Sequence, residues 1–213
     1  MDFDERTRTY LRQLAPPEDE PLRAARARSE EADIPTVPAE TGGLLQWLAR
    51  LRPARGVAEI GSGGGYSGLW LLAGMDPRGV LTTIEVDPDS QALAQQAYTE
   101  AGATARVRSI RGAALSVLGK LADESYDLVF VDSTAAEYPD YLPHARRMLR
   151  PGGLLVADNA FLGGRVADPE DLDDDVLGVR AFTDTLREDS EFDSQLVPLG
   201  SGVLVAVYHP LAD

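Results

Sequence analysis

The sequence predicts an α/β fold built on a mainly parallel sheet. From residue 56 onward, short apolar runs alternate with segments of helical periodicity, and the runs are almost continuous in their apolar character. Such runs are typical of strands buried on both faces, as in a parallel sheet that carries helices on each side. With 213 residues and 44% hydrophobic content, the chain is long enough for one such domain and too apolar to be disordered.

Five apolar runs give the parallel strands, and helices are expected between them. The strands are expected at 56–60, 80–84, 105–110, 128–131 and 154–157, and the helices at 67–74, 88–101, 114–121 and 138–149. Near the end, 195–199 and 203–208 flank a Gly-Ser-Gly turn, and strands joined by so short a turn must be antiparallel. The sum is a Rossmann-like sandwich with a C-terminal antiparallel hairpin.

The N-terminal part of the chain differs from the rest. Residues 1–34 are charged and predict two helices broken at Pro16–Pro17, because proline cannot continue a helix. A proline-containing loop and an amphipathic helix over 40–51 follow, and Trp47 and Trp70 are expected in the core because they fall on apolar helical stripes. We expect one domain over 1–213, with 1–38 as an N-terminal helical cap and 39–213 as the core.

The composition excludes several classes of function. The chain has no cysteine, so it has no disulfide, thiolate metal site or cysteine nucleophile. Its net charge of −15 argues against nucleic acid and anionic membrane surfaces as partners. No apolar run reaches the roughly 18 residues of a membrane span, and the first ten residues do not form a secretory signal. We therefore expect a soluble cytoplasmic protein that binds neither nucleic acid nor membrane.

A glycine-rich loop follows the first predicted strand, where ligands of open α/β sheets bind. The spacing of Gly63–Gly68 fits G-x-G-x-x-G and suggests a dinucleotide such as NAD. The pattern Glu59-x-Gly61-x-Gly63-x-Gly65 instead fits the acidic-led glycine loop of S-adenosylmethionine (SAM) binders. After the second strand, Glu85 can accept hydrogen bonds from the ribose hydroxyls of either ligand. Small residues at 112–113, after the third strand, leave room for an adenine ring.

Oxygen-bearing side chains follow the fourth and fifth predicted strands. Asp132 ends one apolar run, and Asp158 and Asn159 end the next. The carboxyl ends of parallel strands share one edge of the sheet, so these side chains should meet there. Carboxylate and amide oxygens are ligands for hard cations such as Mg²⁺, Ca²⁺ or Mn²⁺. The sequence therefore predicts a divalent metal site.

These segments together resemble the small cation-dependent class I O-methyltransferases, which include caffeoyl-CoA and catechol O-methyltransferases and their bacterial relatives. The resemblance runs from about residue 35 to the end of the chain, in family order. It rests on EIGSGGGYS (59–67), TTIEVD (82–87), RGAAL (111–115), YDLVFVD (126–132), LRPGGLLVADN (149–159) and VPLGSGVLVAV (197–207).

The resemblance implies a role for each matched position. The residues that would hold SAM are Val37, Glu59, Gly61, Gly63, Ser67, Glu85, Gly112, Ala113 and Asp132. Within that set, Glu59 to Ser67 would hold the methionine part, Glu85 the ribose, and 112–113 would border the adenine. Asp132, Asp158 and Asn159 would hold Mg²⁺ or another divalent cation, which makes Asp132 catalytic. The implied reaction is methyl transfer to a hydroxyl of a small, catechol-like acceptor, in a homodimer.

One departure from the family pattern bears on activity. The family usually carries a lysine, proposed as the general base, three residues after the first metal aspartate; here that position is Ala135, and Lys120 is the only lysine of the chain. Loss of a general base typically costs about 10²–10⁴ in rate. A catalytically weak or idle SAM-binding homologue is therefore one alternative, and a NAD-dependent oxidoreductase is another. Arg165 is expected in a mobile loop, where its side chain could contact an anionic substrate, and the acidic run 168–175 is expected to be a solvated loop that leads into a helix N-terminus.

Overall fold

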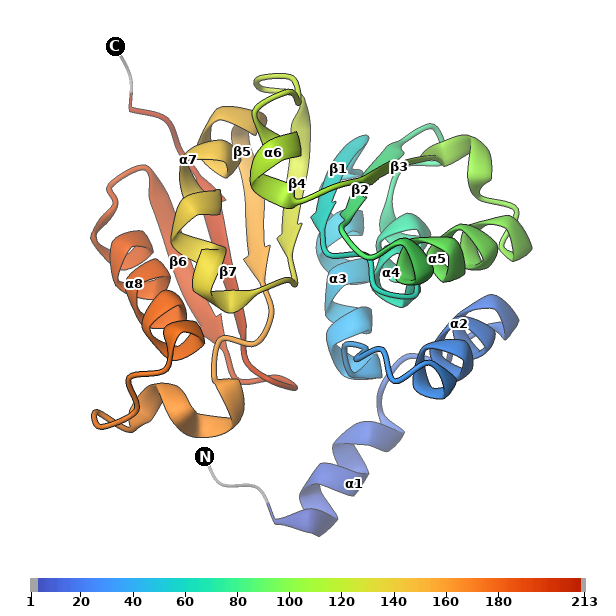
Figure 1. Cartoon of the computed structure of the whole chain (residues 1–213), viewed down its shortest axis with the longest axis horizontal. Coiled ribbons are helices and arrows are strands. Elements are labelled where there is room, and N and C mark those ends of the chain that lie inside the picture. The colour runs from blue at the N-terminus through green and yellow to red at the C-terminus, as the bar shows by residue number, and fades with distance from the viewer. Residues whose placement is uncertain (1–3, 212–213) are drawn as a thin grey trace.

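The computed structural model describes residues 4–211 and has a seven-stranded sheet with helices on both faces (Figure 1). The strands are β1 Gly56–Ile60, β2 Val80–Glu85, β3 Val107–Arg111, β4 Tyr126–Val131, β5 Leu149–Ala157, β6 Phe192–Val197 and β7 Val203–Tyr208. Their order is β3-β2-β1-β4-β5-β7-β6. Strands β1 to β5 pair in parallel, whereas β7 pairs antiparallel with both β5 and β6. The predicted fold class, including the C-terminal hairpin, is confirmed.

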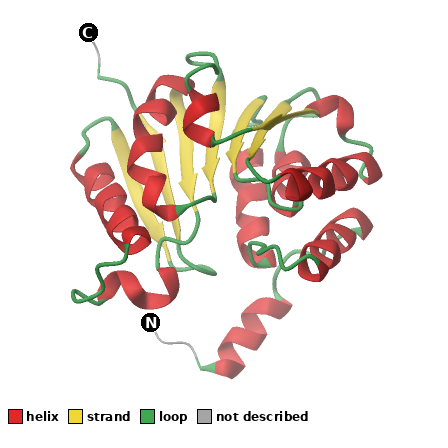
Figure 2. Ribbon diagram, in the orientation of Figure 1, coloured by secondary structure: helices red, strands yellow, loops and turns green. Residues whose placement is uncertain are grey.

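The helices alternate with these strands along the chain (Figure 2). They are α1 Glu5–Gln13, α2 Glu20–Glu31, α3 Ala39–Leu51, α4 Tyr66–Gly74, α5 Pro88–Glu100, α6 Ala114–Leu118, α7 Tyr138–Met148 and α8 Asp174–Glu188, with short 3₁₀ turns η1 Thr104–Arg106, η2 Ala135–Glu137 and η3 Leu162–Ala167. The two predicted N-terminal helices are present and are separated at the proline pair. No helix of the described residues is long and apolar enough to cross a membrane.

Helix α8 begins within the acidic run 168–175, where the sequence predicts a solvated loop leading into a helix N-terminus. In the structure, the Asp173 carboxylate accepts a hydrogen bond from the Asp175 backbone N–H at 3.1 Å and caps the helix. Acids at a helix N-terminus also interact favourably with the helix dipole. The acidic run therefore starts a helix whose buried face carries Val176, Val179 and Phe182.

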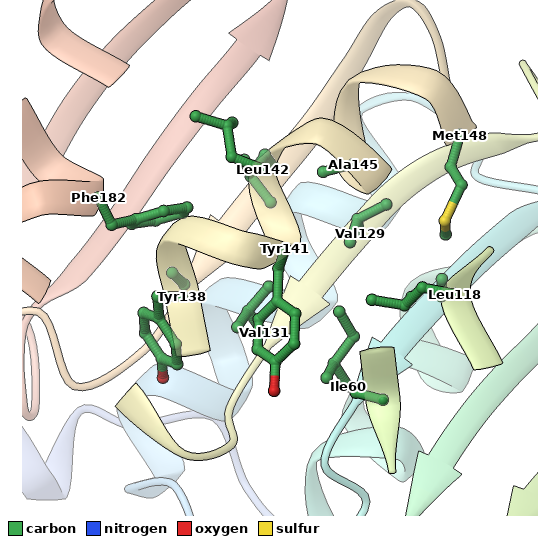
Figure 3. Close-up of a cluster of buried hydrophobic side chains, with 14 of the residues drawn as sticks. Ile60, Leu118, Val129, Val131, Tyr138, Tyr141, Leu142, Ala145, Met148 and Phe182 are labelled. Atoms are coloured by element: carbon green, nitrogen blue, oxygen red, sulfur yellow. The ribbon is translucent and has the colours of Figure 1, made fainter. Parts of the chain in front are cut away.

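The side chains of each strand point alternately to the two faces of the sheet, and two hydrophobic cores form, one on each face. Val57 of β1 and Leu128 of β4 face the layer of α3, α4 and α5, and α2 packs on that same side. Ile60 and Val129 face the layer of α6, α7 and α8, part of which is drawn in Figure 3. Because successive strand residues point to opposite faces, an unbroken apolar strand fills both cores.

One core prediction is wrong. Trp70 of α4 is 1% exposed, as expected, but Trp47 of α3 is 57% exposed. The buried face of α3 is formed by Leu45, Leu48 and Ala49, and Trp47 lies on the opposite side of the helix. Helix α3 carries apolar residues on more than one side, so the sequence pattern alone could not identify the side that packs.

Candidate functional site

A cavity of about 520 Å³ lies at the carboxyl ends of the parallel strands. The strand order reverses between β1 and β4, and open α/β sheets bind ligands at this point. The predicted site residues that line the cavity are Val37, Gly61, Gly63, Ser67, Glu85, Gly112, Ala113, Asp132, Asp158 and Asn159. The structure thus brings together ten predicted residues from six segments of the chain.

The glycine loop is packed too tightly for side chains at two positions. Gly61 has a φ of +91°, and a Cβ there would lie 1.9 Å from the Asp132 carbonyl oxygen. A Cβ on Gly64 would lie 2.1 Å from the Ser29 Oγ of α2. The first glycine lets β1 turn against the end of β4, and the second lets α2 lie on the loop.

Glu59 is the one predicted cofactor residue whose side chain does not line the cavity. It is fully buried beneath the loop, where its carboxylate accepts hydrogen bonds from the Ser67 hydroxyl at 2.7 Å and the Thr83 hydroxyl at 2.6 Å. Burial raises the pKa of Glu59 to about 7. The expectation of direct contact with a ligand is corrected: Glu59 reaches the cavity through Ser67, whose hydroxyl it orients.

Glu85 lies at the tip of β2 and is held by backbone amides. Its Oε2 accepts hydrogen bonds from the backbone N–H groups of Ser62 and Gly63, at 3.1 and 2.9 Å. Its Oε1 accepts from those of Val86 and Asp87, at 2.9 and 3.0 Å. The carboxylate therefore fixes the glycine loop to the end of β2, at the rim of the cavity.

The N-terminal segment closes one side of the cavity. The Tyr66 hydroxyl, at the start of α4, donates a 2.5 Å hydrogen bond to Glu18, and Arg26 of α2 donates to both oxygens of the same carboxylate. The hydrogen bond from Arg26 lowers the pKa of Glu18. This contact holds α2 on the glycine loop, so that residues 34–37 line the cavity.

The ends of β4 and β5 each carry a carboxyl group on the cavity wall, of which Asp158 is buried and Asp132 is half-buried. Burial raises the pKa of Asp132 to about 7, with a further contribution from the neighbouring charge of Asp158, and burial raises the pKa of Asp158 to about 6. The Asn159 amide donates a 2.9 Å hydrogen bond to Asp132 Oδ1, but Asp158 Oδ1 is buried without a partner among the described residues.

Buried carboxyl groups of this kind need a partner. Within residues 4–211, no three His, Cys, Asp or Glu side chains gather into a metal-binding cluster. The third oxygen-bearing group at this tip is an amide, so the set Asp132, Asp158 and Asn159 offers two carboxylates and one amide oxygen. That donor set suits a hard cation that keeps water or substrate in its remaining positions.

The position of the missing lysine lies outside the cavity wall. Ala135 in η2 is 5% exposed, and the neighbouring Ala136 backbone N–H donates to the Asp175 carboxylate at 2.9 Å. Helix α8 packs directly against η2. Lys120 lies beyond the end of α6 and does not line the cavity either.

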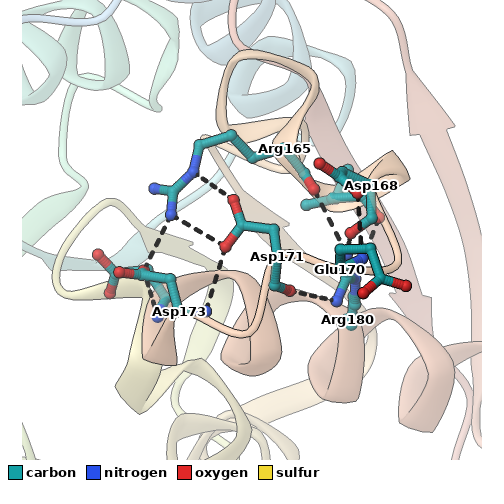
Figure 4. Close-up of polar contacts among 8 residues, drawn as sticks. Arg165, Asp168, Glu170, Asp171, Asp173 and Arg180 are labelled. Carbon is teal, nitrogen blue, oxygen red and sulfur yellow. Dashed lines mark hydrogen bonds and ion pairs between the residues drawn. The ribbon is translucent and has the colours of Figure 1, made fainter.

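The segment after β5 is tied down rather than free. Arg165 donates to both oxygens of Asp171, at 2.8 and 3.2 Å, and pairs with Asp173 (Figure 4). Arg180 of α8 donates to the backbone carbonyls of Val166 and Asp171. Arg165 thus forms ion pairs with acids of its own segment and does not line the cavity. This corrects the expectation that it contacts a substrate.

Several cavity residues were not predicted. Ser133, Glu137 and Tyr141 line the wall between β4 and α7, and Ser201 enters from the β6–β7 turn. Ser133 could have been predicted, because it directly follows Asp132, which was expected in the site. Glu137 and Tyr141 carried no sequence signal, because a helix start offers many such polar residues.

Comparison with known proteins identifies the family. Residues 17–208 match the family model described as O-methyltransferase. A Mycobacterium marinum protein that carries the name O-methyltransferase is 48% identical over 191 residues, which are 89% of this chain and 85% of that protein. The O-methyltransferase TomG from Streptomyces achromogenes, solved in complex with SAM, is similar with a TM-score of 0.89 and 36% identity, over 98% of this chain and all of that one.

A third similarity points the same way. An O-methyltransferase from Bacillus cereus, solved in complex with SAH, has a TM-score of 0.88 and 28% identity, with 95% of this chain and 97% of that chain covered. The matches extend over nearly the whole chain, including the glycine loop and the ends of β4 and β5. This chain therefore belongs to the O-methyltransferase family.

Proposed function

We propose that the protein transfers the methyl group of SAM to a hydroxyl of a small, catechol-like acceptor, with a divalent cation at the ends of β4 and β5. The observation that carries this proposal is the unpartnered, buried Asp158 Oδ1 beside Asp132, in the same cavity as the glycine loop and Glu85. The SAM and SAH complexes of the two similar structures support the choice of cofactor.

The glycine-loop side of the cavity suits the methionine and ribose parts of SAM. The Ser67 hydroxyl donates its hydrogen bond to Glu59, so its lone pairs remain to accept from the ligand's ammonium group. Glu85 would accept from the ribose hydroxyls, since it sits at the tip of the second strand. Val37, which is 4% exposed, would exclude water from the sulfonium. Gly112 and Ala113 would border the adenine.

Asp132, Asp158 and Asn159 would hold the cation. Their fit is supported by the two raised carboxyl pKa values and by the lone Asp158 oxygen, since a bound cation would remove both penalties. When bound, the cation supplies Lewis acidity that lowers the pKa of a coordinated hydroxyl. Positioning of that oxygen in line with the methyl group accounts for much of the remaining acceleration.

The charge of the cavity wall limits the acceptor. Its described lining includes the carboxyl groups of Glu85, Asp132, Glu137 and Asp158 but no Lys, Arg or His. A wall of this charge repels carboxylates and phosphates, even with one divalent cation bound. We therefore propose a neutral or cationic acceptor rather than an anionic one such as an acyl-CoA ester.

Methyl transfer from SAM to a matched catechol series tests this proposal. Dopamine, 4-methylcatechol and protocatechuate differ in side-chain charge but share the ring hydroxyls. We expect turnover with Mg²⁺, loss of turnover with EDTA, and the highest KM for protocatechuate. Turnover that is insensitive to EDTA would refute the role of the cation, and preference for the anionic catechol would refute the charge argument.

Ala135 favours a second candidate, a SAM-binding homologue with little or no catalysis. Its distinguishing result is SAH binding in calorimetry with no methyl transfer to any catechol of the series. We expect that Ala135→Lys would not restore a base, because Ala135 is buried next to α8 and does not line the cavity.

A homodimer in the cytoplasm, implied by the family resemblance and the composition, remains a prediction. The exposed Trp47 and Leu51 side chains of α3 form an apolar surface that is consistent with an interface. Light scattering of the purified protein would measure the mass directly, and a monomer at micromolar concentration would contradict the dimer.

A further inference from the structure

Two tyrosines on neighbouring turns of α7 make different contacts, and of the two only Tyr141 is among the described lining residues of the cavity. The Tyr138 ring packs edge-to-face on Phe182, and its hydroxyl donates to the Asp158 carbonyl oxygen at 3.3 Å. The Tyr141 hydroxyl instead donates to the Glu137 carboxylate at 2.5 Å. Figure 3 shows both hydroxyls directed toward the same end of the sheet, with Tyr141 on the side of Ile60. Tyr138 thus contacts the chain at the end of β5, whereas Tyr141 contacts Glu137 on the cavity wall.

The cavity wall around Tyr141 includes apolar and small residues. Tyr141 shares a buried cluster with Ile60, Ile84 and Ala114. Gly112, Ala113 and Ala114 line the same cavity at the start of α6, where the absence of larger side chains leaves space for a flat ring. A planar, mostly apolar heterocycle fits such a space.

Glu137 is an acidic side chain of this wall, and only one of its two carboxylate oxygens accepts a hydrogen bond from the described residues. Its Oε2 accepts the hydrogen bond from Tyr141, while no described residue donates to its Oε1. Burial and the nearby Glu137 raise the pKa of Tyr141, so its hydroxyl stays protonated and remains a donor. The contact orients the carboxylate and leaves one oxygen free to accept a hydrogen bond from a ligand.

We propose that Glu137, oriented by Tyr141, accepts a hydrogen bond from the exocyclic amino group of the cofactor's adenine and thereby selects adenosine over its deaminated analogue. This inference rests on the proposed binding of SAM with its adenine beside Gly112–Ala113. An inosine-type base presents an oxygen in place of the amino group, and a carboxylate repels it. Hydrogen bonds to charged groups are strong enough to give about 10–100-fold discrimination.

Calorimetric titration with SAH and with S-inosylhomocysteine tests the inference. We expect the wild-type protein to bind SAH about 10–100-fold more tightly than the inosyl analogue. Glu137→Ala should lose affinity for SAH by about that factor while its affinity for the analogue changes less than about threefold, so that the preference disappears. Tyr141→Phe should weaken the preference only in part, because the carboxylate remains but loses its orienting donor.

Asp140→Ala is the matched control, because Asp140 is an exposed acid of the same helix that does not line the cavity. It removes one negative charge and should leave both affinities unchanged. Thermal unfolding of each variant checks that the fold is intact. A wild-type preference that survives in Glu137→Ala would overturn this inference alone, whereas a wild-type protein that binds neither nucleoside would overturn the proposed function as well.

Discussion

The two sides of the cavity differ in how completely their polar groups are satisfied. On the β1–β2 side, Glu59 accepts from three hydroxyls and Glu85 from four backbone amides, all within the protein. On the β4–β5 side, Asp132 has a single amide donor and Asp158 Oδ1 has none among the described residues. The carboxylates of the first side are thus already hydrogen-bonded within the protein. The proposed divalent cation would complete the second side, so that on this proposal cofactor binding and chemistry depend on separate parts of the site.

The largest expected effect comes from removing the unpartnered carboxylate. Asp158→Ala should reduce kcat/KM for methyl transfer by about 10²–10⁴, because a Lewis-acid contribution of several kcal/mol is lost. Affinity for SAH should change by less than about threefold, since the β1–β2 side is untouched. Steady-state kinetics and calorimetry on the same preparation measure the two effects. Equal losses in kcat/KM and in SAH affinity would contradict the separate roles of the two sides.

A second large effect is expected where the two sides touch. Gly61→Ala places a Cβ against the Asp132 carbonyl at a positive φ. The left-handed backbone costs about 1–2 kcal/mol for a residue other than glycine, and the steric overlap adds about 1–3 kcal/mol. Urea unfolding should reveal the summed loss of stability.

Gly102→Ala is the matched control for this substitution. Gly102 has a φ of +65°, and nothing lies within 4 Å of the position that a Cβ would take there. It should lose only the backbone contribution of about 1–2 kcal/mol. A loss at Gly61 no larger than that at Gly102 would contradict the close approach of β1 and β4.

The N-terminal contact should have a smaller effect, on binding alone. Glu18→Gln weakens the hydrogen bonds from Tyr66 and Arg26 that hold α2 on the glycine loop. Charge-assisted bonds at a partly exposed site predict a loss of SAH affinity of about three- to tenfold, expressed as faster dissociation. Stopped-flow displacement measures that rate. Glu20→Gln, at an exposed position, serves as the control. An equal effect in that variant would show that the Glu18 contact does not hold the cofactor in place.

A further effect concerns the pH dependence of stability and leaves the catalytic groups in place. Burial raises the pKa of Glu59 from 4.5 to about 7, so between these values the folded state binds more protons than the unfolded state. Its contribution to stability is therefore full at low pH and is lost as pH rises through about 7. Glu59→Gln should flatten the decline of stability across the range from the unfolded to the folded pKa, as measured by urea unfolding at several pH values. An unchanged slope would show that Glu59 is not the group responsible.

Most of the fold, and ten of the eleven cofactor and metal residues expected in the cavity wall, could be predicted from the sequence, because strand tips and glycine spacing are local features. Glu59 was misplaced, since a motif does not tell whether an acid faces the ligand or the core beneath the loop. Arg165 was misplaced because its ion pairs with Asp171 and Asp173 form only when the segment folds, and the sequence does not show them. Glu137 and Tyr141 could not be found, because their meeting depends on the turn from η2 into α7.

The central claim is that the β4–β5 side is completed by a divalent cation, and one titration tests it most directly. Mg²⁺ is added to the SAH-saturated protein in a calorimeter, for the wild type and for Asp158→Ala. The account predicts one saturable site in the wild type and no binding in the variant. Absence of Mg²⁺ binding to a wild-type protein that still methylates catechol in EDTA would contradict it.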